Sequence, residues 1–314
     1  MTEILATVLP VFGLILMGFA TMRAGLVKQS ASEGLSQYVF VIGLPALLFR
    51  TMVEVNPPQQ APWGLWACYF GAVIVVWILT ILLARSLRLL PGEEATSAAM
   101  ASGFSNLLML GLPIIYGHYG ADATLAAALI ISIHAPLQWM GATLVMEWQR
   151  QRSGLNYASL LKGLAWDLVR NPIVMALIAG SLWRQTGLGL TPVVKSMLTM
   201  LSESSVPTAL VALGFSLAIL PLAGQIRPAL LIVFLKMLVM PLVALALGLA
   251  FAVPPLWIAV AVVFAAIPTG ANAYLFATRY RAALAPVSAA IGMGTAFAAL
   301  SLPLILWLLD NLLL

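Results

Sequence analysis

The chain has 314 residues, of which 62% are hydrophobic and 8% charged, with a formal net charge of +5. Soluble domains carry about 25% charged residues, so this composition excludes a soluble globular protein and predicts one embedded in lipid. The basic residues sit in short links between apolar runs, which indicates membrane topology and not nucleic-acid binding. The single cysteine, Cys68, and the absence of a Cys/His cluster with metal-ligand spacing predict no disulfide, no metal site and no cofactor.

Apolar runs of about 20 residues, the length of a membrane-spanning helix, recur along the chain between prolines and glycines. The sequence therefore predicts an all-α polytopic membrane protein. The longest polar link, 148–169, separates a first half, 1–147, from a second half, 170–314, with five spans each. The ten expected spans are 4–22, 35–53, 63–87, 96–117, 122–147, 170–186, 194–220, 229–252, 256–279 and 286–309.

The distribution of Lys and Arg predicts the orientation of these spans. With the N-terminus outside, eleven basic residues fall on the inner side and three on the outer side, and Lys236 lies within a span. Cytoplasmic links are enriched in Lys and Arg, so we expect both termini outside (periplasmic) and the central link in the cytoplasm. The inner residues are Arg23, Lys28, Arg85, Arg88, Arg150, Arg152, Lys162, Arg170, Arg227, Arg279 and Arg281, and the outer ones Arg50, Arg184 and Lys195.

Two apolar spans contain an asparagine close to a proline. The first is GFSNLLMLGLPIIYG, with Asn106 and Pro113, and the second is FAAIPTGANAYLFATRY, with Pro268 and Asn272. Lipid offers no water to replace a lost backbone hydrogen bond, so a broken helix at this depth indicates a site inside protein or beside a watery cavity. Interrupted spans in corresponding positions of two halves are typical of a transporter's substrate site.

The two halves show a weak internal repeat at an offset of 166 residues. At this offset Asn106 falls on Asn272, and the other asparagines of the chain lie in links or near ends. Five spans in each half mean that the second half enters the membrane from the opposite side. Copies related in this way are inverted copies.

Five segments together resemble the auxin efflux carrier family in its short bacterial form. They are LPVFGLILMGFATMRAGL, LSQYVFVIGLPALLF, GFSNLLMLGLP, FLKMLVMPL and PTGANAYLFATRY, and they cover the chain from end to end. Bacterial members of that family are described as permeases for small organic acids such as malonate and malate. The resemblance therefore implies a permease in the inner (cytoplasmic) membrane.

The resemblance also implies an architecture. It predicts ten helices in two inverted five-helix repeats, with scaffold helices at 4–53 and 170–220 and transport-bundle helices at 63–147 and 229–309. The fourth helix of each repeat is expected to be broken, and the two broken helices to cross at mid-membrane. Substrate is expected beside that crossing, at Asn106 and Asn272, with the helix breaks at Pro113 and Pro268. Members are expected to form homodimers through the scaffold.

The residue types at the expected crossing suit an organic anion. An asparagine amide donates two hydrogen bonds, and helix N-termini add free N–H groups and a positive dipole end. The alternative for each asparagine is a packing contact between helices. The hydroxyls of Ser105 and Thr269 could donate to the ligand or cap helix ends, and Gly270 allows backbones to approach closely.

Three ionisable residues are candidates for coupling or electrostatic support. Lys236 lies within a span, where it could be a fixed cation supporting the crossing, attract the anion, or extend to the membrane interface. Glu203 could carry a coupling proton, pair with Lys236, or simply mark a helix entry. His134 could relay protons or pack as a hydrogen-bonded side chain.

These observations predict a secondary transporter for mono- or dicarboxylates that works by alternating access, in contact with membrane lipid. No GxxxxGK[ST] loop is present, so we expect no ATP drive by this chain. No HExxH or GxSxG motif is present, so we expect no enzyme. The alternatives are a sodium-coupled bile-acid-type symporter and a passive anion channel. Coupling to protons, to sodium or to neither stays open.

Overall fold

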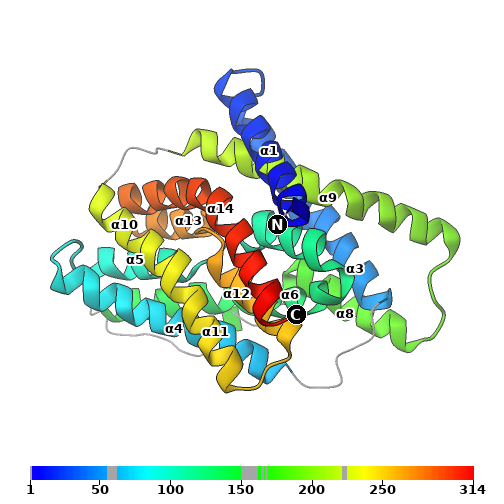
Figure 1. Ribbon diagram of the computed structural model, residues 1–314. Coiled ribbons are helices and arrows are strands. Elements are labelled where there is room, and N and C mark those ends of the chain that lie inside the picture. The colour runs from blue at the N-terminus through cyan, green and yellow to red at the C-terminus, as the bar shows by residue number, and fades with distance from the viewer. Residues whose placement is uncertain (1, 55–61, 150–161, 164–165, 167–168, 221–224) are drawn as a thin grey trace.

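The computed structural model describes residues 2–54, 62–149, 162–163, 166, 169–220 and 225–314, and most of the 148–169 link lies outside them. Figure 1 shows that the described chain is built of helices. The elements in chain order are α1 (Thr2–Arg23), α2 (Gln29–Tyr38), η1 (Val39–Gly43), α3 (Leu44–Glu54), α4 (Trp63–Ser86), α5 (Gly92–Gly103), η2 (Leu107–Gly111), α6 (Leu112–Gln149), α8 (Pro172–Gln185), α9 (Pro192–Ile219), α10 (Ile226–Phe234), η3 (Leu235–Val239), α11 (Met240–Ala250), α12 (Pro255–Ala266), α13 (Ala271–Tyr280) and α14 (Leu284–Leu312).

Within the described residues, seven helical stretches are long and apolar enough to cross a membrane. They are Ile4–Arg23, Gln29–Glu54, Trp63–Ser86, Leu107–Gln149, Pro192–Ile219, Ile226–Ala250 and Leu284–Leu312. The protein is therefore an all-α polytopic membrane protein.

The other expected spans correspond to shorter or divided helices. The 170–186 span is the 14-residue α8, and the 256–279 span is divided between α12 and α13. The stretch Leu107–Gln149 changes direction at Gly120, where φ is 75° and ψ is −160°. Gly120 lies between the spans expected at 96–117 and 122–147, and its backbone conformation is one that side chains disfavour. The full count of ten spans stays a prediction.

Local sequence explains where the first two helices of the second half, α8 and α9, begin. The side chain of Asn171 accepts a hydrogen bond from the N–H of Ile173 at 2.9 Å, and Pro172 follows as the first residue of α8. The hydroxyl of Thr191 likewise caps α9, which begins at Pro192. A polar cap followed by proline satisfies a free N–H and presets the helical φ.

Three π-helical turns, η1, η2 and η3, each end two residues before a proline, at Pro45, Pro113 and Pro241. A proline ring clashes with the carbonyl four residues earlier in a regular α-helix, and here that carbonyl lies inside the π turn. The wider turn relieves the clash. These prolines are therefore accommodated within continuous helical stretches and do not break them.

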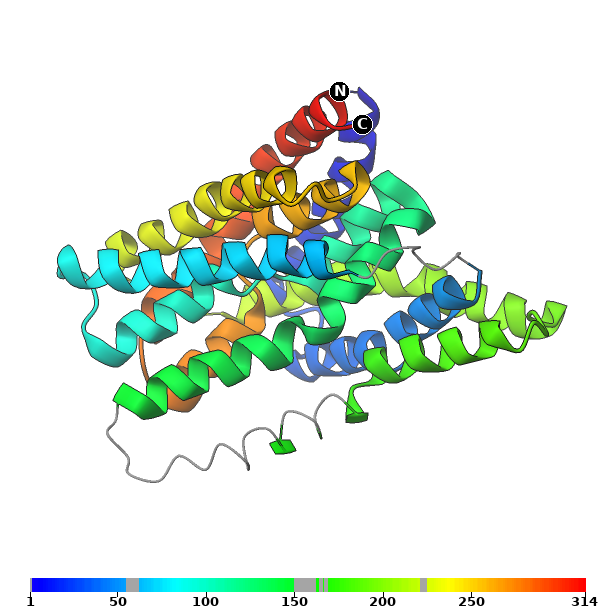
Figure 2. The same cartoon turned by 90° about the horizontal axis from the view of Figure 1, so that it is seen from below.

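The helices pack as two groups. The panel helices are α1, α2, α3, α8 and α9, in which α1 packs along α9 and α3 packs between α8 and α9. The bundle helices are α4, α5, α6 and α10 to α14, in which α4 packs against α5 and α11. Figure 2 shows α4 and α11 (cyan and yellow) side by side on one face, and α3 beside the green α8 and α9 on the other.

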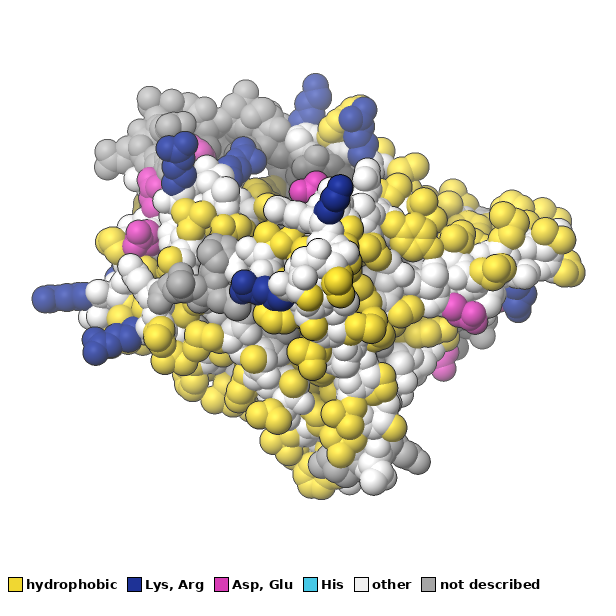
Figure 3. All heavy atoms as spheres, turned by 90° about the horizontal axis from the view of Figure 1, so that it is seen from above, with side chains coloured by type: hydrophobic (Ala, Val, Ile, Leu, Met, Phe, Trp, Pro, Cys, Tyr) yellow, Lys and Arg dark blue, Asp and Glu magenta, His cyan; other side chains and the backbone are white. Residues whose placement is uncertain are grey.

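The outer faces of many helices are apolar. Leu16 is 67% exposed, Leu182 58% and Leu300 77%. A soluble monomer rarely exposes contiguous apolar surface on this scale, so these faces suit contact with lipid. In Figure 3 hydrophobic atoms cover much of the visible face, and most of the Lys and Arg side chains in view gather toward one end of it.

Candidate functional site

Two interruptions of the helices lie side by side at the centre of the molecule. One is Phe104–Asn106, between α5 and η2, and the other is Ile267–Gly270, between α12 and α13. The N–H of Asn106 donates to the carbonyl of Pro268 at 3.0 Å, and the N–H of Gly270 donates to the carbonyl of Phe104 at 2.9 Å. Ser105 and Thr269 thus form an antiparallel β-bridge. Each break satisfies backbone groups of the other, which makes them tolerable in an apolar interior.

One of the two prolines lies at a helix break as expected, and the other does not. Pro268 lies in the second break, and its carbonyl is one of the bridging acceptors. Pro113 lies on α6, beyond η2, so the first break is not at Pro113 and instead precedes it at Phe104–Asn106. The reason is that the π turn absorbs Pro113, while the pairing with the second break holds Asn106 out of the helix.

Buried side chains close the C-terminal end of the helix that enters each break. At the first break, the Gln138 side-chain amide donates to the carbonyl of Gly103 at 2.6 Å, and the Thr269 hydroxyl donates to the carbonyl of Ala101 at 2.9 Å. At the second break, the Lys236 ammonium donates to the carbonyl of Ala265. Donors at a helix C-terminus satisfy its free carbonyls, and a cation also complements the dipole.

Lys236 is fully buried, with 0% of its surface exposed, and its Nζ also lies 3.3 Å from Sδ of Met240. The lysine therefore does not extend to the membrane interface. Its contact with Ala265 places it behind the second break, as a support for the end of α12. Glu203 lies exposed on α9 and forms no ion pair with Lys236 among the described residues.

Glycines allow the two breaks to approach each other. A Cβ atom added at Gly270 would lie 3.1 Å from the Phe104 ring and 3.2 Å from the carbonyl oxygen of Ser105. A Cβ atom added at Gly103 would lie 2.2 Å from Nε1 of Trp77. A side chain at Gly103 would overlap Trp77, and one at Gly270 would press on the other break, so both positions favour the smallest residue.

A cavity of about 100 Å³ lies against the two breaks. Its walls come from Phe104–Met109 of the first break and η2, from Gly270–Asn272 of the second break and α13, from Ile131, His134 and Ala135 of α6, and from Phe40 of η1. Pockets for drug-sized ligands measure about 300–1,000 Å³, and one water takes about 30 Å³. This cavity therefore suits a small molecule.

Both predicted asparagines line this cavity. Asn106 is 8% exposed and Asn272 is half-buried, and neither side-chain amide makes a hydrogen bond to another described residue. Asn106 immediately precedes η2, and Asn272 is the second residue of α13. Two amides and two helix N-termini at one cavity provide neutral donors for an anion.

The α6 wall of the cavity carries a buried polar chain. The Tyr69 hydroxyl donates to the Ser105 hydroxyl at 2.9 Å, and Nδ1 of His134 lies 3.3 Å from the same Tyr69 oxygen. Ser105 is 1% exposed and His134 is 3% exposed. Sequence reasoning identified Ser105 and His134 but not Tyr69, Gln138 or Phe40. Polar residues in apolar runs, Tyr69 in ACYF and Gln138 in PLQW, were the available signal.

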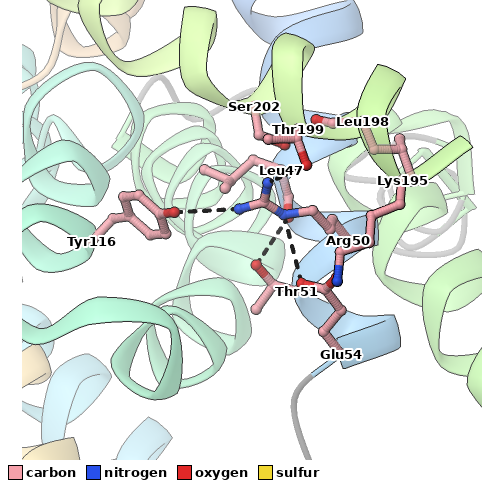
Figure 4. Close-up of polar contacts among 9 residues, drawn as sticks. All are labelled: Leu47, Arg50, Thr51, Glu54, Tyr116, Lys195, Leu198, Thr199 and Ser202. Carbon is pink, nitrogen blue, oxygen red and sulfur yellow. Dashed lines mark hydrogen bonds and ion pairs between the residues drawn. The ribbon is translucent and has the colours of Figure 1, made fainter. Parts of the chain in front are cut away.

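A second polar cluster lies at the end of α3 (Figure 4). The Arg50 guanidinium donates to the hydroxyl of Thr199 on α9 at 3.0 Å and to the hydroxyl of Tyr116 on α6 at 3.3 Å. Its Nε also lies 3.8 Å from Glu54, which pairs with Lys195 at 2.9 Å. Arg50 therefore forms an ion pair within α3 and also links the panel helices to the bundle helices.

Comparison with known proteins agrees with a transport function. The chain is 27% identical over 287 residues to a protein of Rhizobium meliloti (strain 1021) whose name assigns it provisionally to malonate transport, covering 89% of this chain and 88% of the relative. It is 24% identical over 305 residues to an uncharacterized transporter of Methanothermobacter thermautotrophicus, covering 95% and 96%. A lysosomal cholesterol signaling protein of Mus musculus matches with 26% identity over 197 residues, 57% of this chain and 22% of that protein.

The family model described as membrane transport protein matches residues 3–306, nearly the whole chain. The chain therefore belongs to this membrane transport family, that of the auxin efflux carriers.

Proposed function

We propose that this chain is a secondary transporter that moves small organic anions, mono- or dicarboxylates, across the cytoplasmic membrane by alternating access. One observation carries the proposal: two paired helix breaks line one small cavity with two side-chain amides that have no hydrogen-bond partner among the described residues. A membrane protein keeps such donors unpaired at a cost, and a carboxylate supplies the acceptors that they lack. The relative named for malonate transport supports the same substrate class.

The residues of the site divide by role. Asn106 and Asn272 bind the carboxylate, and the Ser105 hydroxyl lines the cavity beside them. Thr269 is engaged with the carbonyl of Ala101, so it holds the breaks together, and Gly270 allows their close approach. The small cavity favours compact acids over large aromatic ones.

The proposed transporter has two inverted five-helix repeats, and the packing supports this. At the 166-residue offset α1 corresponds to α8 and α3 to the end of α9, so the pairs α1–α9 and α3–α8 exchange under the repeat. Tyr38 and Ser204, exactly one repeat apart in number, share a hydrogen bond at 2.6 Å. Residues that contact their own repeat equivalents lie close to a two-fold axis.

The repeats extend the proposal to the whole molecule. The panel helices are the scaffold and the interface of a homodimer, and the bundle helices carry the crossing breaks. Both termini lie outside, as the distribution of Lys and Arg favours.

Counterflow in proteoliposomes tests the function. Vesicles loaded with malonate, malate, lactate or indole-3-acetate take up the same labelled acid, and the parent protein is compared with Asn272→Ala. We expect trans-stimulated uptake of at least one acid by the parent and its loss in Asn272→Ala. The matched control is Asn311→Ala, at the exposed end of α14, which should retain uptake.

Each alternative has its own outcome. A channel would give flux without trans-stimulation, and a sodium-coupled symporter would lose uptake when choline replaces sodium. Counterflow that persists in Asn272→Ala would keep a carrier and refute the site. Absence of counterflow for every acid, in folded protein, would refute the substrate class.

A further inference from the structure

Nε2 of His134 is a buried polar atom with no hydrogen-bond partner among the described residues. Its ring lines the central cavity and packs edge-on against Phe104, with ring centroids 4.5 Å apart. A buried polar group in a native structure nearly always has a partner. The nitrogen itself is enclosed, but its ring belongs to the cavity wall, so the cavity is the direction from which a missing partner would arrive.

The hydrogen bonds of Tyr69 determine which nitrogen of the neutral His134 ring carries the proton. The single hydroxyl proton of Tyr69 goes to the Ser105 hydroxyl, so the Tyr69 oxygen acts as an acceptor toward Nδ1 of His134. A neutral imidazole has one donor and one acceptor nitrogen. Nδ1 is then the donor, and Nε2 of neutral His134 carries a lone pair.

A carboxylate has only acceptor atoms, so it cannot bind a lone pair at Nε2. It binds there only when one proton lies between the two groups. The imidazolium also lacks a counter-ion without substrate, because no described acidic side chain forms an ion pair with His134. A buried charge without a partner is costly, so anion and proton favour each other's binding.

We propose that His134 is a direct substrate ligand and that one proton enters and leaves the site with each carboxylate. The proposal rests on the proposed function. Water on one side supplies the proton to Nε2, the N–H so formed donates to the carboxylate, and both leave as free anion and proton on the other side. Tyr69 positions the ring, and Tyr69 and Lys236 are the titratable groups that face it.

The test measures proton movement with acid uptake. Proteoliposomes contain a trapped pH dye and a potassium–valinomycin clamp, and labelled malonate is added outside, with lactate in parallel. We expect the parent to acidify the lumen by one proton per acid. Its KM should rise about tenfold per pH unit above the pKa of the site, as one required proton dictates. Vesicles without protein measure passive entry of undissociated acid.

Two variants assign the proton to its residue. The amide of His134→Gln can donate to a carboxylate without a proton, so we expect weaker counterflow in which lumen acidification and the pH slope of KM are lost. His118→Gln, at the other histidine of the chain, pairs with Asp310 outside the cavity and should behave as the parent. Counterflow by the parent without acidification, or an unchanged pH slope in His134→Gln, would overturn the inference and leave the proposed function standing.

A different observation, the Arg50–Tyr116 hydrogen bond, carries a second inference. A second cavity of about 320 Å³ adjoins the central one at Ala271 and opens near the beginning of α2, beside Ser32 and Glu33. Arg50 lies near the other end of the stretch Gln29–Glu54, about 30 Å away at 1.5 Å per residue. The opening of the second cavity and the polar cluster of Figure 4 thus lie toward opposite ends of the stretch Gln29–Glu54, and Phe40, which lines the central cavity, lies between them along that stretch.

We infer that Arg50 and Tyr116 form an outer gate, which closes this form of the transporter toward the outside. The inference rests on the proposed orientation. Arg50 is held on the panel by Thr199 and Glu54, so its bond to Tyr116 ties the panel to α6. Outward opening by movement of the bundle must break this bond.

Access from outside tests the gate. A Cys68→Ala, Leu108→Cys background places a thiol on the central cavity, and a membrane-impermeant maleimide is added outside oriented vesicles. We expect Tyr116→Phe to label about 2–10 times faster, as the loss of one hydrogen bond allows. Tyr119→Phe, one helical turn along α6, should not change the rate. An unchanged rate in Tyr116→Phe, or an equal increase in both variants, would overturn the gate.

Discussion

The two breaks at the centre of the molecule have the same backbone pairing but differ in the chemistry behind them. The helix entering the first break ends against neutral donors, the Gln138 amide and the Thr269 hydroxyl. The helix entering the second ends against the buried Lys236 ammonium. The comparison shows that the end of a half-helix in a membrane can be closed by a side-chain amide or by a buried lysine, and that here the lysine lies behind the central cavity and does not line it.

Removing the cation should have the largest effect on this pair of helix ends. Lys236→Met leaves the carbonyl of Ala265 without its buried donor, and hydrogen bonds to charged groups contribute about 1.5–3 kcal/mol. We expect a lower thermal unfolding midpoint in detergent and loss of counterflow. Lys195→Met, at a lysine that is 59% exposed, should shift the midpoint little. Equal midpoints for the two variants would contradict a supporting role for Lys236.

Separating the breaks should have an intermediate effect. Gly270→Ala adds a methyl group 3.1 Å from the Phe104 ring and 3.2 Å from the carbonyl oxygen of Ser105, so the bridge must widen. We expect the free energy of unfolding to fall by about 1–2 kcal/mol, the lower part of the range for overpacking. We also expect weaker binding of the acid. Thermal unfolding and the concentration dependence of counterflow measure the two effects. Gly34→Ala, where no atom lies within 4 Å of the new Cβ, is the control, and an equal response would argue against close approach.

Removing the neutral donor should have the smallest effect. Gln138→Leu leaves the carbonyl of Gly103 without its donor, but the Thr269 hydroxyl still donates to the carbonyl of Ala101 in the same last turn of α5. Polar contacts between membrane helices contribute about 0.6–1.7 kcal/mol, and charge-assisted bonds are about twice as strong as neutral ones. The thermal unfolding midpoint of Gln138→Leu should therefore lie between that of Lys236→Met and that of the exposed control Gln185→Leu. A larger loss than Lys236→Met would reverse the comparison.

Much of the helix pattern follows from the sequence alone. Apolar run length predicts the long helices well, because lipid leaves the backbone no other partner than itself. The two mid-span asparagines were predicted to lie near each other, and the structure brings both to one cavity. The first break was placed too late, at Pro113, because proline is a local signal whereas the break at Asn106 depends on pairing with a segment about 160 residues away.

The side chains around the breaks and the cavity could not be predicted in the same way. Phe40, Tyr69 and Gln138 lie on helices that are apolar on all sides, so the sequence does not show which face turns inward. The rotation of such helices is set by packing against their neighbours. For Lys236 the sequence left three roles open, and only its burial and its contact with Ala265 separate them.

The β-bridge between the breaks has a consequence for how the protein selects by size. Two backbone hydrogen bonds join the two breaks beside the central cavity, so the breaks cannot move apart to make room for a longer acid. The wall formed by Phe40 belongs instead to the panel, which no β-bridge ties to the breaks in the described chain. In the proposed transporter, a longer acid would therefore press against the panel helices. It would be refused because it hinders movement of the bundle helices past the panel helices, more than because it fails to bind.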